Sequence, residues 1–263
     1  MTASPRTDEL LAALHRSHDR LAAVLASVPD EEVTEQSYAA EWTIAQVASH
    51  LGSGAEVFGL FLDAGVQHAT APGVEQFSPV WDRWNAAAPV TQAREAVDAD
   101  AAFLARVGAL PDEERERWRL DLFGSEQTLP GLLRMRLGEH ALHTWDIAVA
   151  RDPAATVPED AAGLVLDGLP GLAERTGRPA DEPLRIDVGS TGPERRWRLE
   201  LTGSGVRLTA PASDDAPATA SLALPAEAFV RLVYGRLDAG HTPAGVRAGG
   251  VDLDVLRRTF PGF

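Results

Sequence analysis

The spacing of apolar residues changes near residue 155, and this change limits the possible folds more than any other feature of the sequence. Before it, apolar residues recur every three or four positions, as in amphipathic helices. After it they alternate and are interrupted by glycine, as in strands joined by tight turns. We therefore expect a fold of class α plus α+β. Residues 1–155 would form a four-helix bundle, and residues 156–263 a small α+β domain with an antiparallel sheet.

Four helices are predicted in the first segment. The first has an apolar stripe and ends at Pro29, and the third covers about residues 91–110. The second starts at Thr43, where Gln46 completes a capping box, and the fourth follows Thr128 and ends before residue 152. The stripe of the first helix consists of Leu10, Leu14, His18, Leu21, Leu25 and Val28. The buried face of the third is expected to consist of Ala93, Val97, Ala101, Leu104 and Val107.

The connection between the second and third helices, residues 66–90, is long enough to have a function. Its aromatic residues Phe77, Trp81 and Trp84 either form a lid over a pocket or pack the loop against the bundle. In the second segment we expect strands at residues 184–188, 196–201, 206–209 and 220–224, with short helices at 160–175, 225–234 and 251–260.

Composition excludes several kinds of partner. The formal net charge of −15 repels nucleic-acid phosphates and anionic lipids, so neither nucleic acid nor membrane is expected to bind. No apolar stretch reaches the roughly 18 residues that a membrane span needs, and the first twenty residues lack the pattern of a secretory signal. We therefore expect a soluble, cytoplasmic protein.

Cysteine and lysine are both absent from the sequence. The chain therefore has no disulfide, no cysteine nucleophile and no Schiff-base lysine. Any thiol chemistry would need an external thiol.

Three residues suggest a metal site. Glu139 and His143 are four apart in the fourth helix, so their side chains lie on one face. His50 borders the buried face of the second helix, and Gly52 and Gly54 would leave room beside it. Two imidazoles and one carboxylate from facing helices suit Zn²⁺ or another divalent ion with open coordination positions. The plain alternatives are an exposed Glu–His contact and a core histidine.

Two segments carry a resemblance to a known family. Residues 41–52 (EWTIAQVASHLG) and 138–147 (GEHALHTWDI) resemble the mycothiol-dependent maleylpyruvate isomerase family of DinB-like four-helix-bundle metalloenzymes. The residues after 155, through 232–236 (LVYGR), look like that family's small sterol-carrier-protein-like domain. The resemblance implies that His50, Glu139 and His143 bind Zn²⁺. It also implies that mycothiol, a thiol of actinobacteria, supplies the sulfur.

Four further residues are candidates for supporting roles. Asp146 would orient a metal-binding histidine, or face solvent. Arg136 would bind the cofactor or an anionic substrate, or pair with a surface acid. His18 would be an acid or base in the bundle cavity, or pack in the core. The resemblance implies a catalytic arginine in the second domain, for which Arg236 is the first candidate and Arg247 its rival.

The expected function is activation of mycothiol as a metal-bound thiolate. Its partner would be an electrophile that accepts the thiol, or an unsaturated acid like maleylpyruvate that is isomerised from cis to trans. A non-catalytic accessory protein that binds a metal or small ligand is the main alternative. A second-domain function in binding a hydrophobic molecule is another. The sequence leaves open whether the protein is a monomer or a homodimer.

Overall fold

The computed structural model describes residues 7–213 and 215–262. Residues 1–6 belong to the segment tested above for a secretory signal and lie outside the described residues. The chain divides into two compact units, Met1–Thr156 and Val157–Phe263. No helix in residues 7–213 or 215–262 combines the length and the apolar character needed to cross a membrane.

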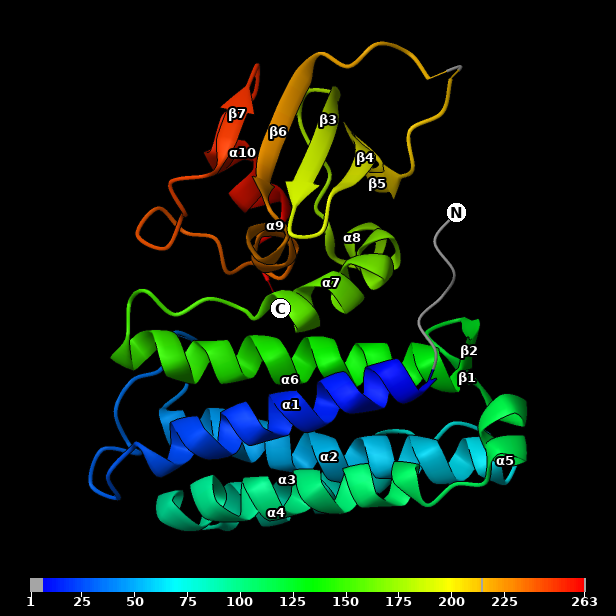
Figure 1. Ribbon diagram of the computed structural model, residues 1–263, viewed down its shortest axis with the longest axis vertical. Coiled ribbons are helices and arrows are strands. Elements are labelled where there is room, and N and C mark those ends of the chain that lie inside the picture. Colours follow the sequence, from blue (N-terminus) through cyan, green and yellow to red (C-terminus); the bar gives the residue numbers. More distant parts are fainter. Residues whose placement is uncertain (1–6, 214, 263) are drawn as a thin grey trace. The chain divides into compact units, whose positions relative to one another are not determined.

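The first unit is built on a four-helix bundle (Figure 1). In the bundle α1 and α2 each pack against both α4 and α6. The helices of this unit are α1 (Thr7–Ala26), α2 (Ile44–Val66), α3 (Val74–Ala86), α4 (Pro89–Gly108), α5 (Asp112–Arg117) and α6 (Leu129–Arg151). The bundle confirms the predicted helical class of this segment.

The ends of α2 and α6 follow from local hydrogen bonds. At the start of α2, the Thr43 side chain accepts from the Gln46 backbone N–H, and the Gln46 side chain accepts from the Thr43 backbone N–H. This is the capping box that the sequence predicts. At the start of α6, the Thr128 side chain accepts from the Gly131 backbone N–H, and Pro130 stands in the first turn where no N–H is needed.

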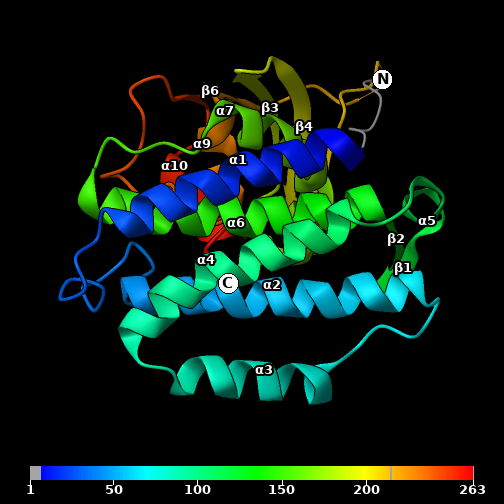
Figure 2. The ribbon, with the colours of Figure 1, turned by 60° about the horizontal axis from the view of Figure 1, so that its bottom comes forward.

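The long connection after α2 is not a loop, because most of it forms α3. This helix packs along the side of α2 (Figure 2). Trp84 is buried, and its indole N–H donates to Glu56 on α2 at 2.8 Å. The Trp84 ring fills the space at Gly52, where an added Cβ would lie 2.2 Å from the ring. Trp84 therefore packs the connection against the bundle, whereas Trp81 is 39% exposed.

The segment between α4 and α6 contains structure that the sequence analysis missed. After α5, strands β1 (Arg119–Leu122) and β2 (Ser125–Thr128) form a two-stranded antiparallel hairpin. Trp118 anchors it: the ring lies against Gly65, and its indole N–H donates to the Leu62 carbonyl at 2.9 Å. Four-residue strands are too short to show a clear alternation in the sequence.

The buried face of α4 differs from the predicted one. Ala93, Leu104 and Val107 are buried, but Ala101 is exposed, and Asp100 stands in the buried stripe instead. The prediction chose Ala101 because it is apolar. Helical geometry instead turns position 100 inward with positions 93, 96, 104 and 107.

The second unit combines short helices with a five-stranded sheet. Its helical elements are α7 (Glu159–Val165), η1 (Leu166–Gly168), α8 (Leu169–Thr176), α9 (Ala226–Val233) and α10 (Leu253–Thr259). Its strands are β3 (Leu184–Thr191), β4 (Arg195–Thr202), β5 (Gly205–Thr209), β6 (Ala220–Pro225) and β7 (Arg247–Gly249).

The sheet order is β5-β4-β3-β6-β7. Strands β3, β4 and β5 form the predicted antiparallel meander, and β6 and β7 are also antiparallel. The pairing of β3 with β6 is parallel, because the long connection from β5 returns the chain to the far side of β3. Strand β7 was not predicted. Every residue of α9 is buried, and Phe229 packs on Trp197 of β4.

Candidate metal centre

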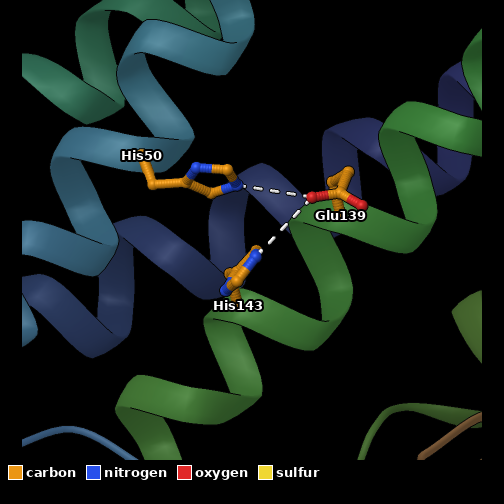
Figure 3. Close-up of side chains that lie close together, drawn as sticks. All are labelled: His50, Glu139 and His143. Atoms are coloured by element: carbon orange, nitrogen blue, oxygen red, sulfur yellow. Dashed lines mark hydrogen bonds and ion pairs between the residues drawn. The ribbon is translucent and has the colours of Figure 1, made fainter. Parts of the chain in front are cut away.

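His50 on α2 and the pair Glu139 and His143 on α6 point toward one another (Figure 3). The Nε2 atom of His50 lies 3.3 Å from Oε2 of Glu139, and Nε2 of His143 lies 3.6 Å from the same oxygen. The two imidazole rings have centroids 4.5 Å apart. The side chain of His50 is 39% exposed and that of Glu139 is 30% exposed. One side of the cluster is therefore accessible.

The spacing of these donor atoms fits a metal ion. One ligand atom from each of the three residues lies within 4.8 Å of the other two, and among the described residues this is the one group of three such donors. Two donors that each lie about 2.0–2.1 Å from a tetrahedral zinc ion are about 3.3 Å apart. The observed separations of 3.3 and 3.6 Å match that geometry with little movement. Three protein donors leave a fourth position open.

The protonation of His50 and Glu139 also suits a cation. Burial lowers the pKa of His50, and the neighbouring His143 adds to this effect, against the opposing contact with Glu139. Burial raises the pKa of Glu139, but its contacts with His143 and His50 outweigh burial and hold that pKa well below its usual range. A neutral imidazole and an ionised carboxylate are the forms that bind a metal.

Asp146 supports His143 from the same helix. Its Oδ2 lies 2.8 Å from Nδ1 of His143, and the Asp146 side chain is fully buried. A carboxylate accepts hydrogen bonds, so Nδ1 of His143 carries the proton and Nε2 presents its lone pair to the cluster. Of the two roles considered for Asp146, the structure favours orientation of the histidine over exposure to solvent.

Trp42 forms an aromatic wall beside the cluster. Its ring centroid lies 5.1 Å from that of His50 and 6.0 Å from that of His143. Trp42 comes just before Thr43, the cap of α2, so the segment that leads into this helix also packs against both imidazole rings. Trp42 was not among the residues predicted for the site, although it lies eight residues before His50 in the segment that resembles the family.

The first unit has a counterpart among known protein families. Residues 14–148 match the family model described as the mycothiol maleylpyruvate isomerase N-terminal domain. The chain belongs to this family. No curated protein matches the chain. The solved structures that share its fold include the mycothiol-dependent maleylpyruvate isomerase and a mutant of that enzyme in which one histidine is replaced by alanine. Each is 16% identical over 96% of this chain and 98% of the other, with a TM-score of 0.66.

The match to the mycothiol maleylpyruvate isomerase family covers α2, α4 and most of α6. Not every residue predicted for the site lies at the cluster of His50, Glu139 and His143. Arg136 is buried in the bundle core, with 1% of its side chain exposed. Its Nη2 donates to Asp100 Oδ1 at 2.8 Å and to the Leu51 carbonyl at 3.0 Å. The predicted pair with a surface acid is wrong, because Asp100 is itself buried. The burial also leaves Arg136 almost no surface for a cofactor to contact.

His18 contacts the buried carboxylate of Asp100, which also binds Arg136. Its Nδ1 is 3.0 Å from Asp100 Oδ2, and 18% of its side chain is exposed. The hydrogen bond to Asp100 raises the pKa of His18 against the opposing effect of burial. Sequence reasoning missed Asp100, which links both residues. The signal was a carboxylate in register with the apolar stripe of α4.

Arg236 belongs to the second unit and is nearly buried at 9% exposure. Its Nη1 donates to the Tyr234 carbonyl at 2.9 Å, just after α9. Its rival Arg247 lies on the exposed strand β7 and donates to the carbonyls of Ala244 and Val246. A role for either arginine in the reaction stays a prediction.

The expected free space beside His50 is filled. Gly52 accommodates the Trp84 ring, and Gly54 lies against the Arg136 guanidinium, where an added Cβ would come within 3.0 Å of Nη1. These glycines therefore allow side chains from α3 and α6 to approach α2. They do not open a cavity for a ligand.

Proposed function

We propose that this protein is an enzyme that holds Zn²⁺ or another divalent cation with His50, Glu139 and His143, and uses mycothiol. The reaction would be transfer of the thiol to an electrophile, or cis–trans isomerisation of an unsaturated acid like maleylpyruvate. The proposal depends on the convergence of three donors from α2 and α6, in a bundle that belongs to this family. Oε2 of Glu139 lies 3.3 Å from Nε2 of His50 and 3.6 Å from Nε2 of His143.

The chain's own residues prepare the site for a thiol. Glu139 contributes a single negative charge, so a divalent cation held there keeps a net positive charge. When bound, the cation would favour the thiolate of mycothiol over its thiol, and the thiolate is the nucleophile. Asp146 holds the His143 ring in the tautomer that directs Nε2 to the site. Trp42 limits rotation of both rings.

The absence of cysteine supports an external sulfur, because no residue of this chain can form a thiolate. The second unit, Val157–Phe263, is proposed to correspond to the sterol-carrier-protein-like domain of the family. Arg236 is retained as its candidate for binding a substrate carboxylate, since a guanidinium binds that group in a bidentate manner.

Metal analysis of the purified protein tests the proposal. We expect about one zinc ion per chain, and we expect His50→Ala and His143→Ala to lose it. His15→Ala, which changes an exposed histidine of α1, serves as the matched control and should keep it. Equal zinc binding by the parent and His50→Ala would contradict the site.

Assays with mycothiol then separate the activities. The parent protein is incubated with mycothiol and either maleylpyruvate or a bimane electrophile. Product from bimane alone would identify a transferase, and product from maleylpyruvate an isomerase. A protein that binds zinc at the three residues but converts neither compound would be an accessory protein, and the proposed enzyme activity would be rejected.

A further inference from the structure

A second polar cluster lies in the core of the bundle, centred on the carboxylate of Asp100 on α4. Its Oδ1 accepts from Nη2 of Arg136 at 2.8 Å. Its Oδ2 lies 3.0 Å from Nδ1 of His18 and 3.1 Å from Nε2 of His140. Asp100, Arg136 and His140 are all at most 1% exposed. We call these four residues, together with Ser17, the Asp100 cluster.

The Asp100 cluster lies next to both segments that bear the metal donors, one on α6 and one on α2. On α6, His140 directly follows Glu139, and Arg136 precedes Glu139 by one turn. On α2, the carbonyl of Leu51, the residue after His50, accepts from Nη2 of Arg136 at 3.0 Å. That nitrogen is the one that also donates to Asp100. The carboxylate of Asp100 is therefore linked to both α2 and α6, the two helices that supply the metal donors. Helix α4, which bears Asp100, supplies none of these donors.

The Asp100 cluster is unsuited to chemistry of its own. The hydroxyl of Ser17 lies 2.8 Å from Nδ1 of His140, so a hydroxyl, an imidazole and a carboxylate stand in the order used by serine hydrolases. Ser17 and His140 are 1% and 0% exposed, however, so no substrate reaches the hydroxyl. A nucleophilic site is excluded on access alone.

The charge of Asp100 in the core is weak evidence of a stabilising role. Desolvation raises the pKa of Asp100, but its interactions with His140, Arg136 and His18 outweigh it and hold that pKa far below its usual range. Asp100 is therefore ionised in the core. A buried ion pair of this kind is often no more stabilising than well-packed apolar residues, and one role documented for such pairs is to specify one arrangement of helices. Here that arrangement includes the spacing between His50 and Glu139.

We propose that Asp100 is a positioning residue for the metal centre. Through Arg136 it holds the α2 backbone beside His50, and through Arg136 and His140 it holds the α6 turn that bears Glu139. This inference rests on the proposed metal site, and it adds a residue from a third helix that does not touch the metal.

The test compares zinc affinity of the full-length parent and Asp100→Asn by competition with a chromophoric chelator. Asparagine has the same shape but lacks the charge that holds Arg136 and His140. We expect affinity to fall about tenfold, the lower end of the range for groups that orient metal ligands, because Asp100 acts through Arg136 and His140. In metal-free protein, the imidazole ¹⁵N signals of His50 and His143 should shift as well.

Glu227→Gln is the matched control. Glu227 is a buried carboxylate of the second unit, and it binds the buried Arg231 in a bidentate manner at 2.7 and 3.0 Å. Its replacement removes a comparable buried charge from the other unit. We expect zinc affinity and the signals of His50 and His143 to stay at parental values, which separates positioning from general loss of stability.

A double variant keeps the test decisive if Asp100→Asn does not fold. Asp100→Asn with Arg136→Met removes both charges, which is tolerated better than removal of one. We expect it to fold and to bind zinc as weakly as Asp100→Asn. Parental zinc affinity and unshifted imidazole signals in either folded variant would overturn the proposal.

The outcome is distinguishable from failure of the proposed function. If the parent itself binds no zinc, the metal site is rejected, yet the imidazole signals of metal-free protein still decide the role of Asp100. Shifts at His50 and His143 in Asp100→Asn, absent from Glu227→Gln, would support positioning. Unchanged signals would reject it.

Discussion

Replacing Asp146 by Asn should weaken metal binding without removing a metal donor. Asp146 is fully buried, and its Oδ2 lies 2.8 Å from Nδ1 of His143. Asparagine has nearly the same shape, but its amide is a weaker acceptor than a carboxylate. If the amide nitrogen turned toward Nδ1, the imidazole proton would move to Nε2, the atom that faces Glu139 and the site.

The size of the effect follows from this contact. Loss of a group that orients a metal-binding histidine costs about tenfold to a hundredfold in affinity, or about 1.4–2.7 kcal/mol. Because asparagine can still accept through its oxygen, we expect the lower end, about tenfold. His143→Ala removes the donor itself and should lower affinity much further.

The assay is zinc competition against a chromophoric chelator, with urea unfolding measured in parallel. Asp82→Asn, on the exposed side of α3, is the control and should bind zinc like the parent. If Asp146→Asn bound zinc within twofold of the parent while His143→Ala lost binding, the role assigned to the 2.8 Å contact would be refuted.

Three further predictions concern the surroundings of the site. Gly52→Ala places a methyl 2.2 Å from the Trp84 ring and should cost about 1–3 kcal/mol of unfolding free energy in urea; parental stability would show that the ring moves aside freely. Trp42→Ala should weaken zinc binding by about 0.5–1.5 kcal/mol and Trp42→Phe by less, whereas equal affinities would exclude the aromatic wall. The hydrogen bond to Asp100 raises the pKa of His18, so the stability it provides is complete below about pH 6.5 and is lost as pH rises through the folded-state value. The difference in unfolding free energy between the parent and His18→Gln should therefore shrink from about pH 6 to about pH 9, and a constant difference would contradict this assignment.

Local sequence signals predicted the main helices well. The capping box at Thr43 and the start of α6 after Thr128 depend on residues within one turn of each other, so the sequence alone shows them. The same reasoning missed α3, where Pro79 and mixed polarity obscure the helical pattern, and it missed the short hairpin of β1 and β2. It also placed Ala101 rather than Asp100 on the buried face of α4.

The candidate site shows the same limit. The separation of four residues is enough to place Glu139 and His143 on one face of a helix, because 3.6 residues complete a turn. It does not show that His50 faces them, since 89 residues separate His50 from Glu139. The resemblance of residues 41–52 to the family supplied that expectation, and the packing of α2 against α6 produces the contact.

The main helices, the caps of α2 and α6, the lack of a cysteine and the pair of donors on α6 can all be read from the sequence. The packing of the helices shows, in addition, that Arg136 faces inward to Asp100, that Trp84 occupies the space at Gly52, and that His50 joins the pair. The two sets differ because caps and helix faces depend on neighbours within a turn. Burial of a charge depends on partners that only the packing of distant helices brings close enough to compensate it.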